Sequence, residues 1–276
     1  MPVTSGVEVM DVRRSSAKVG NCHICGGYGA LSFEHVPPES AFNDRTVVTP
    51  DTKRVFELRD LDKLPDLKGK QSQRGQGGYT LCERCNSRTG HWYGSHYAAW
   101  VYQGAGYLAR SKGAATQLAY PYHLLPLRVI KQIVCMFFSV NGARFREAQP
   151  QLERLVLNNE SRGLPPHIKI YVGYLHADRS REAGVAASVQ LGDGVRATQR
   201  RVYSEISFFP FSYILSFDSP APEHEMLDIT FFANYGYNDF ATLHLPIPTL
   251  SVYTPFPGDF RNRETVLRQA HRERDL

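Results

Sequence analysis

Four of the five cysteines in this sequence of 276 residues are arranged as two CxxC pairs. Cys22 and Cys25 form the first pair, and Cys82 and Cys85 form the second. A CxxC turn brings two thiolates close together, so two such turns offer four sulfurs at the corners of a tetrahedron, the arrangement that zinc prefers. The spacing therefore predicts a structural Zn²⁺ ion on these four cysteines.

The same pairs have two other interpretations, which are disulfide bonds and a redox-active CxxC of the thioredoxin type. Residues 1–20 show no secretory leader, so we expect a cytoplasmic protein in a reducing compartment, without disulfides. Neither pair lies in the strand–helix context of a redox motif. Structural zinc is the interpretation that we favour, and the fifth cysteine, Cys135, is expected to be a thiol of the core.

Two ionisable side chains and one amide stand near these cysteines in the sequence. Glu34 and His35 precede Pro37 and Pro38, and Asn86 directly follows the second CxxC pair. Imidazole titrates near neutral pH and suits a general base, whereas carboxylate and amide oxygens suit Mg²⁺. Hydrolysis of a phosphodiester needs a base that deprotonates water and a cation that neutralises charge on the phosphoryl and leaving oxygens.

The run Glu34-His35-Val36-Pro37-Pro38, together with Cys85-Asn86, resembles the signature of the HNH endonucleases, the ββα-metal nucleases. The resemblance covers about residues 20–97. It implies that His35 is the general base that activates water. It also implies that Glu34 and Asn86 hold one divalent ion, Mg²⁺ or Mn²⁺, and that the substrate is DNA, with RNA as an alternative.

The sequence departs from the family pattern in two places. Many family members have an asparagine shortly before the second CxxC pair that braces the loop holding the base, and Gly75–Leu81 contains none. The acidic residue before the base is Glu34, where Asp or His is commoner. Because adjacent strand residues point to opposite faces, Glu34 and His35 can serve one site only if the chain turns there. The two prolines that follow are consistent with a turn.

Basic side chains lie close to Asn86 in the sequence. Arg84 and Arg88 flank it, and both are candidates for contact with nucleic acid because a guanidinium pairs with phosphate through two hydrogen bonds. His91 is a third candidate, with a surface position on a helix as its alternative interpretation. The net charge of +5 is compatible with a polyanionic partner, but it is also common in proteins that never bind nucleic acid.

These residues must be positioned by an α+β fold that begins with a zinc-stapled, HNH-like module. We expect a poorly ordered leader at residues 1–19, the module at 20–104 with an insertion at about 44–78, and a linker at 105–123. Within the module we expect a short strand over 30–34, a second over 79–82, and a helix from about residue 86 to residue 101.

Residues 124–260 are predicted to form an α+β domain with a mostly antiparallel sheet, followed by a charged helical tail at 261–276. Apolar residues at helical spacing predict a helix over 124–140, and a second helix is expected over 150–159. After His167 the period changes to two, which predicts strands. They are 168–174, 186–191, 201–208, 213–217, 227–233 and 242–245. The sequence has no apolar run long enough to span a membrane.

Three functional hypotheses follow from these observations. The first is a metal-dependent endonuclease that cleaves DNA, whose C-terminal domain selects the substrate or receives an activator ligand or protein partner, by analogy with bacterial effectors of phage defence. The second is a non-catalytic zinc-stapled module that binds nucleic acid. The third is an interaction protein whose HNH core has lost its activity. The first requires Glu34, His35 and Asn86 to lie around one ion.

Overall fold

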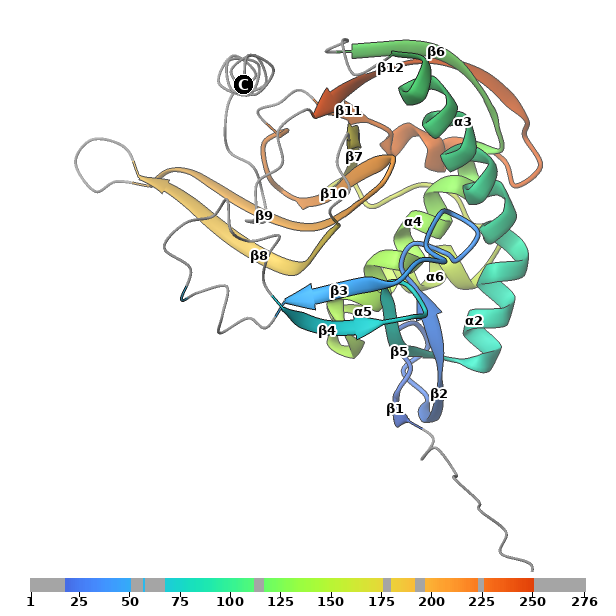
Figure 1. Ribbon diagram of the computed structural model, residues 1–276, viewed down its shortest axis with the longest axis vertical. Helices are drawn as coiled ribbons and strands as arrows, with labels where there is room; N and C mark the ends of the chain where they lie inside the picture. The colour runs from blue at the N-terminus through green and yellow to red at the C-terminus, as the bar shows by residue number, and fades with distance from the viewer. Residues whose placement is uncertain are drawn as a thin grey trace, which may run out of the picture.

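The structure is a computed structural model, and it describes residues 18–50, 57, 68–111, 117–175, 180–191, 197–222 and 226–250. Two sheets lie on either side of a central group of helices (Figure 1). Most of the expected leader and all of the expected tail fall outside the described residues.

The N-terminal part is a three-stranded antiparallel sheet with a helix at its end. The strand order is β1 (Val19–Asn21), β2 (Tyr28–His35) and β5 (Gly77–Cys82). β5 runs directly into a helix, α2 (Glu83–Thr89), which packs on β2 and β5. This strand–strand–helix unit agrees with the expected ββα-like module, although the helix begins three residues earlier than the sequence predicts.

The expected insertion contributes a second, small sheet. β3 (Val47–Pro50) pairs antiparallel with β4 (Gly69–Ser72) beside the ββα-like unit. The segment from Gly69 to Gly78 holds β4, a tight turn and the first residues of β5.

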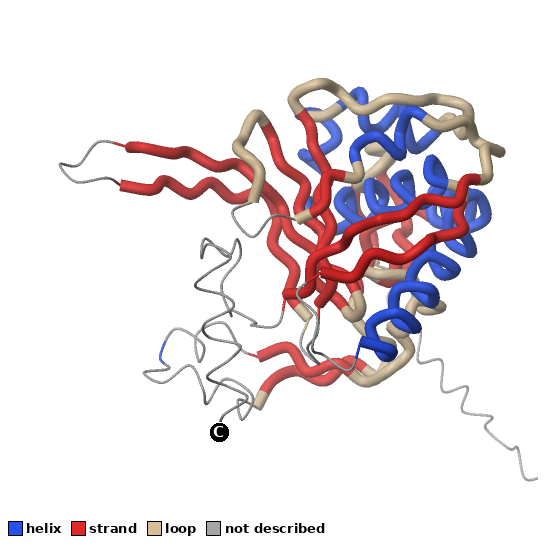
Figure 2. The backbone as a smooth tube through the Cα atoms, turned by 90° about the horizontal axis from the view of Figure 1, so that it is seen from above, coloured by secondary structure: helices blue, strands red, loops and turns tan. Residues whose placement is uncertain are grey.

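The second half contains a seven-stranded sheet in the order β6-β12-β7-β10-β9-β8, with β11 paired to β7. Its strands are β6 (Gln117–Leu124), β7 (Ile168–Leu175), β8 (Arg181–Leu191), β9 (Ala197–Phe208), β10 (Phe211–Phe217), β11 (Leu227–Asp228) and β12 (Ala241–Leu250). Only β12 and β7 pair in parallel, so the prediction of a mostly antiparallel sheet is confirmed. The β8–β9 hairpin projects away from the helices (Figure 2).

Helix α4 (Pro126–Asn141) lies between the two sheets and is buried along nearly its whole length. Proline is favourable in the first turn of a helix, and apolar residues on every face allow burial all round. α5 (Ala143–Ala148) and α6 (Pro150–Leu157) follow it. One continuous core joins Leu81 of the N-terminal unit, Phe137 of α4 and Ile247 of β12. Among the described residues, no helix is both long enough and apolar enough to cross a bilayer.

The structure replaces the expected linker with regular elements. α2 continues through a π-helical segment (Gly90–Gly94) into α3, which runs from Ser95 to Ser111. The sequence predicts a break at Gly104–Gly106, but Gly104 is buried against Phe211. Glycine is used there because the helix and the ring approach closely, not because the chain turns.

Two further differences involve strands. β6 occupies the end of the expected linker, and its Pro121 is tolerated because β6 lies at an edge of the sheet. The strand expected over 227–233 is shorter, since β11 has two residues and a 3₁₀ helix (Thr230–Asn234) follows it.

Candidate metal centre and active site

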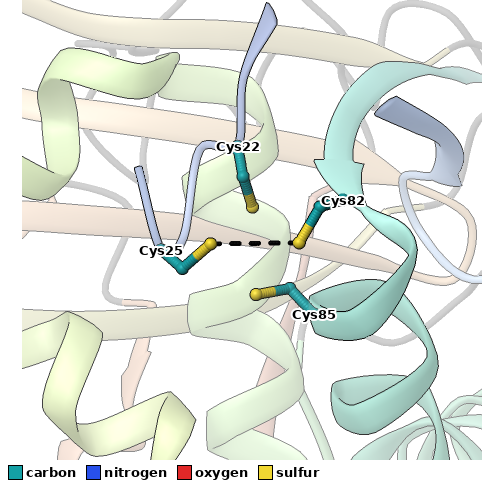
Figure 3. A group of neighbouring side chains, drawn as sticks. All are labelled: Cys22, Cys25, Cys82 and Cys85. Carbon is teal, nitrogen blue, oxygen red and sulfur yellow. Dashed lines mark hydrogen bonds between the residues drawn. The ribbon is translucent and has the colours of Figure 1, made fainter. Parts of the chain in front are cut away.

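The sulfur atoms of the four paired cysteines point toward a common centre (Figure 3). All four Sγ atoms lie within 4.8 Å of one another, and Cys25 Sγ lies 3.9 Å from Cys82 Sγ. A tetrahedral zinc ion with Zn–S bonds of about 2.3 Å places its sulfurs about 3.8 Å apart. Disulfide sulfurs are only about 2.05 Å apart. The four cysteines therefore fit a metal ion, consistent with structural zinc, and they are free of disulfides.

Local backbone geometry places the first two sulfurs. The Gly26 amide donates to the Cys22 carbonyl at 2.8 Å, and the Cys22 amide donates to the Gly27 carbonyl at 2.9 Å, which closes the turn. Gly26 has a φ of 72°, a left-handed conformation that glycine adopts without strain. The other two sulfurs come from the end of β5 and the first turn of α2. A metal on all four would staple β5 and α2 to the first turn.

The Cys22 and Cys85 side chains share one proton through a hydrogen bond. A hydrogen bond from the Cys85 thiol lowers the pKa of Cys22 to about 4, while burial acts in the opposite direction. The same shared proton raises the pKa of Cys85. Because a zinc ion needs all four ligands as thiolates, its binding must release protons and must weaken at low pH.

The first cysteine turn also contacts the C-terminal half. His23 Nδ1 donates to the carbonyls of Phe138 at 3.2 Å and Ser139 at 3.1 Å, at the end of α4. The guanidinium of Arg146 lies over Gly26, where an added Cβ would be 2.6 Å from its Cζ atom. Four thiolates on a zinc ion carry a net charge of −2, so a neighbouring guanidinium stabilises the centre.

Asn86 joins α2 to β2 next to Glu34. Its Nδ2 atom donates to Ser32 Oγ and to the Phe33 carbonyl, both at 3.1 Å. Ser32 therefore faces α2, and Glu34, two residues further along β2, lies on the same face. The irregularity in the pairing of β2 with β5 puts its extra residue on β5, so alternation along β2 is preserved. Within the described chain, Asn86 Oδ1 has no hydrogen-bond partner.

Glu34 is buried on this face, with 7% of its surface exposed. Desolvation raises the pKa of its carboxyl to about 8. The carboxyl lies near the Cys135 thiol of α4, whose pKa is raised by burial first and by Glu34 second. The side chain has no hydrogen-bond or ion-pair partner among the residues that the structure describes. Carboxylate and amide oxygens are the types of ligand that Mg²⁺ takes, one or two from the protein with several waters.

His35 points to the opposite face of β2. Its ring packs edge-on against Phe33, with 4.9 Å between ring centroids and 76° between ring planes. The sequence predicts a turn that brings Glu34 and His35 to one side, but β2 extends through His35 and the chain turns only afterwards. The structure thus places Glu34 on the face of β2 that α2 covers, where Asn86 contacts Ser32 and the Phe33 carbonyl, and leaves His35 at the strand end on the opposite face.

Asn43 is a site residue that the sequence analysis misses. It is 1% exposed, and its Nδ2 donates to the Pro37 carbonyl at 2.6 Å and to the Gln76 carbonyl at 2.8 Å. Its Oδ1 accepts from the Gln76 amide at 2.7 Å. Gly75 allows this approach, since a Cβ there would lie 2.1 Å from the Asn43 carbonyl oxygen. Asn43 braces the loop after His35 against the turn before β5, the role expected of an asparagine within 75–81.

No local pattern distinguishes Asn43 from an ordinary loop asparagine, because two of its three hydrogen bonds are to Gln76, which is 33 residues away. Its sequence position, eight residues after His35 and before the insertion, gives no indication of burial. The asparagine that braces the loop therefore comes from the segment after β2, whereas we expected it within residues 75–81.

The three candidates for nucleic-acid contact lie on the outer side of the helix. Arg84, Arg88 and His91 are all exposed, and the guanidinium of Arg88 lies 5.5 Å from the ring centroid of Trp92. At helical spacing these residues fall on one stripe, about half a turn from Asn86. They can meet nucleic acid that passes over α2, but they do not face Glu34.

Comparison of the chain with protein-family models, with curated proteins and with solved structures finds no match. The geometry of the chain itself therefore carries the functional argument. It comprises a four-cysteine metal centre, a carboxyl and an amide oxygen on one face of β2, and an imidazole at the strand end.

Proposed function

We propose that the protein is a metal-dependent endonuclease of the HNH type that hydrolyses phosphodiester bonds in DNA. Glu34 and Asn86 hold the catalytic divalent ion, Mg²⁺ or Mn²⁺, and His35 is the general base. The observation that supports this proposal most is the pairing of Glu34 and Asn86. A carboxyl that is 7% exposed and has no partner in the described chain lies on the same strand face as an amide whose Nδ2 is fixed and whose Oδ1 is free.

A nuclease mechanism has to account for the division of these groups between the two faces of β2, because the sequence analysis requires all three to lie around one ion and His35 faces away from the other two. In an in-line displacement at phosphorus, the attacking and leaving oxygens lie on opposite sides of the phosphoryl group. In this proposal His35 takes a proton from water at the strand end. Glu34 and Asn86 would hold a divalent ion, which would supply neutralisation of phosphoryl charge. The scissile phosphate then lies across the end of β2, and the brace made by Asn43 holds the loop that follows His35 in place.

The zinc centre has a structural role in this proposal. It holds the start of α2 against the first cysteine turn. Asn86 directly follows the ligand Cys85, so its position is held as well. The partner is DNA, or RNA, with Arg84, Arg88 and His91 contacting phosphates beside the site. The C-terminal sheet selects the substrate or receives an activator, in the manner of bacterial defence effectors.

A non-catalytic zinc-stapled module that binds nucleic acid is the second candidate. It is favoured by the direction of Glu34, whose carboxyl lies near Cys135 in α4 while His35 faces away. In this interpretation Glu34 is a neutral buried carboxyl of the core. Binding would then be sensitive to salt, because phosphate contacts release counterions, and would need no divalent ion.

Cleavage of circular substrates tests the proposal, because only an endonuclease opens them. Zinc-loaded protein is incubated with supercoiled plasmid and with circular single-stranded DNA, in Mg²⁺, in Mn²⁺ and in EDTA. His35→Ala and Glu34→Gln are compared with His244→Ala, which removes an exposed imidazole from β12. We expect cleavage that needs the divalent ion, is at least about a hundredfold slower in the two site variants, and is unchanged in the control.

Zinc content is measured for every variant, so that loss of the metal centre is not mistaken for loss of a catalytic group. Divalent-ion-dependent cleavage that survives both site variants would remove His35 and Glu34 from the mechanism. Absence of cleavage in every condition, together with binding that persists in EDTA while zinc is retained, would favour the second candidate.

A further inference from the structure

The antiparallel strands β2 and β5 have an outer face that points away from α2. This face carries an aromatic–basic surface made of Phe33, His35, Arg74 and Tyr79. Phe33 and Tyr79 are directly paired across the two strands, and His35 lies two residues beyond Phe33 on the same face. Arg74 comes from the turn before β5. Apart from His35, none of these side chains has a part in the proposed hydrolysis.

The rings of this surface are perpendicular to one another. Phe33 and Tyr79 have ring centroids 5.5 Å apart with 82° between their planes, and Phe33 and His35 are similarly edge-on. Tyr79 is 42% exposed, and the Arg74 guanidinium lies over Phe33, 5.9 Å from its centroid. Tyr79 and Arg74 are therefore the two members of this surface that are exposed to solvent, one as an aromatic ring and the other as a guanidinium.

Arg74 gives this surface a positive charge. The side chain is exposed and has no carboxylate partner in the part of the chain that the structure describes. A guanidinium stays charged at any physiological pH, pairs with phosphate through two hydrogen bonds and stacks on aromatic planes. An exposed aromatic ring beside an unpaired arginine is the pair of features with which proteins hold unstacked nucleotides.

We propose that the aromatic–basic surface binds an unpaired nucleotide, with its base stacked on Tyr79 and its phosphate on Arg74. The substrate class of the adjacent site is then single-stranded nucleic acid rather than regular duplex. A ring can stack only on a base whose face is free, and in a duplex both faces are covered by neighbouring pairs. The inference about cleavage depends on the proposed function, whereas binding by this surface does not.

The position of the surface links it to the site. Phe33 directly precedes Glu34, and the Phe33 ring contacts His35 at the end of β2. A nucleotide held here has its backbone beside His35, so its phosphate or the next one lies across the strand end. Stacking of the nucleobase would thus determine which phosphate lies next to His35, the proposed general base.

Binding measured without a divalent ion keeps this proposal separate from the nuclease proposal. Fluorescence anisotropy follows a labelled single strand of about 12 nucleotides and the matching duplex, in buffer with no added Mg²⁺. Tyr79→Leu and Arg74→Gln are compared with wild type. Tyr28→Leu is the matched control, because Tyr28 is an exposed tyrosine, 79% accessible, at the other end of β2.

We expect wild type to bind the single strand more tightly than the duplex. Tyr79→Leu should weaken single-strand binding by roughly 5- to 140-fold, the range for loss of one base–aromatic stack, and Tyr79→Phe should restore it. Arg74→Gln should lower the magnitude of the salt slope by about 0.7, the value for one phosphate on a single strand. Tyr28→Leu should bind as wild type does.

Equal or tighter binding of the duplex would overturn the proposal, as would Tyr79→Leu binding that matches the Tyr28→Leu control. A change in sedimentation of the free protein on Tyr79→Leu, with oligonucleotide binding unaltered, would show instead that the surface joins copies of the chain. Cleavage of circular DNA with no preference for single strands, beside intact His35 dependence, would reject this inference while leaving the nuclease proposal standing.

Discussion

Replacing Gly104 of α3 by alanine should destabilise the protein, although alanine is the better helix former. A Cβ at this position would lie 2.2 Å from Phe211 Cζ and 2.7 Å from Cε2, far inside normal contact. Phe211 is 1% exposed and stacks on Trp100 with 4.8 Å between centroids. The ring therefore cannot swing into solvent, and either the helix or β10 must move.

The magnitude follows from two opposing effects. Gly→Ala in a helix interior is favourable by about 0.5–1 kcal/mol. Overpacking of a closed core costs about 1–3 kcal/mol, and an overlap this close belongs at the upper end. The net loss is about 2–2.5 kcal/mol, which corresponds to a fall in Tm of roughly 3–4 °C for a chain of this size.

Gly106→Ala is the matched control, because it lies on the same helix. Gly106 is exposed, and a Cβ there meets nothing within 4 Å. Only the helix effect remains, so this variant should be more stable by about 0.5–1 kcal/mol. Thermal unfolding followed by circular dichroism, with urea titration to compare the m-values, measures both variants against wild type.

Opposite signs for the two glycines are the decisive result. If the 104–106 segment were a linker, neither substitution would meet a packed ring, and both would be nearly neutral. A Gly104→Ala protein as stable as Gly106→Ala would therefore refute the packing of α3 on Phe211, and with it the continuous core that joins the two halves.

Three further predictions concern the metal centre, a buried cation and the brace. Cys85→Ser should abolish retention of one zinc per chain, measured by atomic absorption after dialysis, while Cys135→Ala should keep the metal. Lys131 is fully buried and donates hydrogen bonds to the carbonyls of Asn158 and Asn159. Burial lowers the pKa of its ammonium group to about 8. The folded state therefore binds fewer protons than the unfolded state between about pH 8 and 10.5. The stability of wild type relative to Lys131→Met should therefore rise across that window, by at most about 3 kcal/mol in urea titrations, and a flat difference would contradict this. Asn43→Ala should lower the free energy of unfolding by about 2–4 kcal/mol, because it leaves buried backbone groups of Pro37 and Gln76 unpaired. The variant should also cleave more slowly while it keeps its zinc. Unchanged stability would show that the brace is not needed.

Local chemistry and periodicity were enough for part of the fold. The two CxxC pairs identify the four-cysteine centre because ligand type and spacing are themselves the signal. The long buried helix α4 and the strands of the antiparallel sheet follow from their apolar periods. Each of these features is encoded within a window of a few residues.

The same reasoning failed where distant segments meet. From the sequence, Gly104 indicates a break in the helix. In the structure α3 continues through Gly104, which packs against the Phe211 ring of β10. β6 reads as a linker, and it becomes a strand only through pairing with β12. Asn43 has the sequence features of an ordinary loop residue, and its role depends on the carbonyls of Pro37 and of Gln76, which is 33 residues away.

For the candidate site, the sequence by itself determined which groups are available: four thiolates, a carboxyl, an imidazole and an amide. Only the tertiary structure decided their directions, with Glu34 and Asn86 on the helix-facing side of β2 and His35 on the other. The physical reason is that residue type fixes what a side chain can bind. The strand's pleat, the pairing with β5 and the staple to α2 fix where it points.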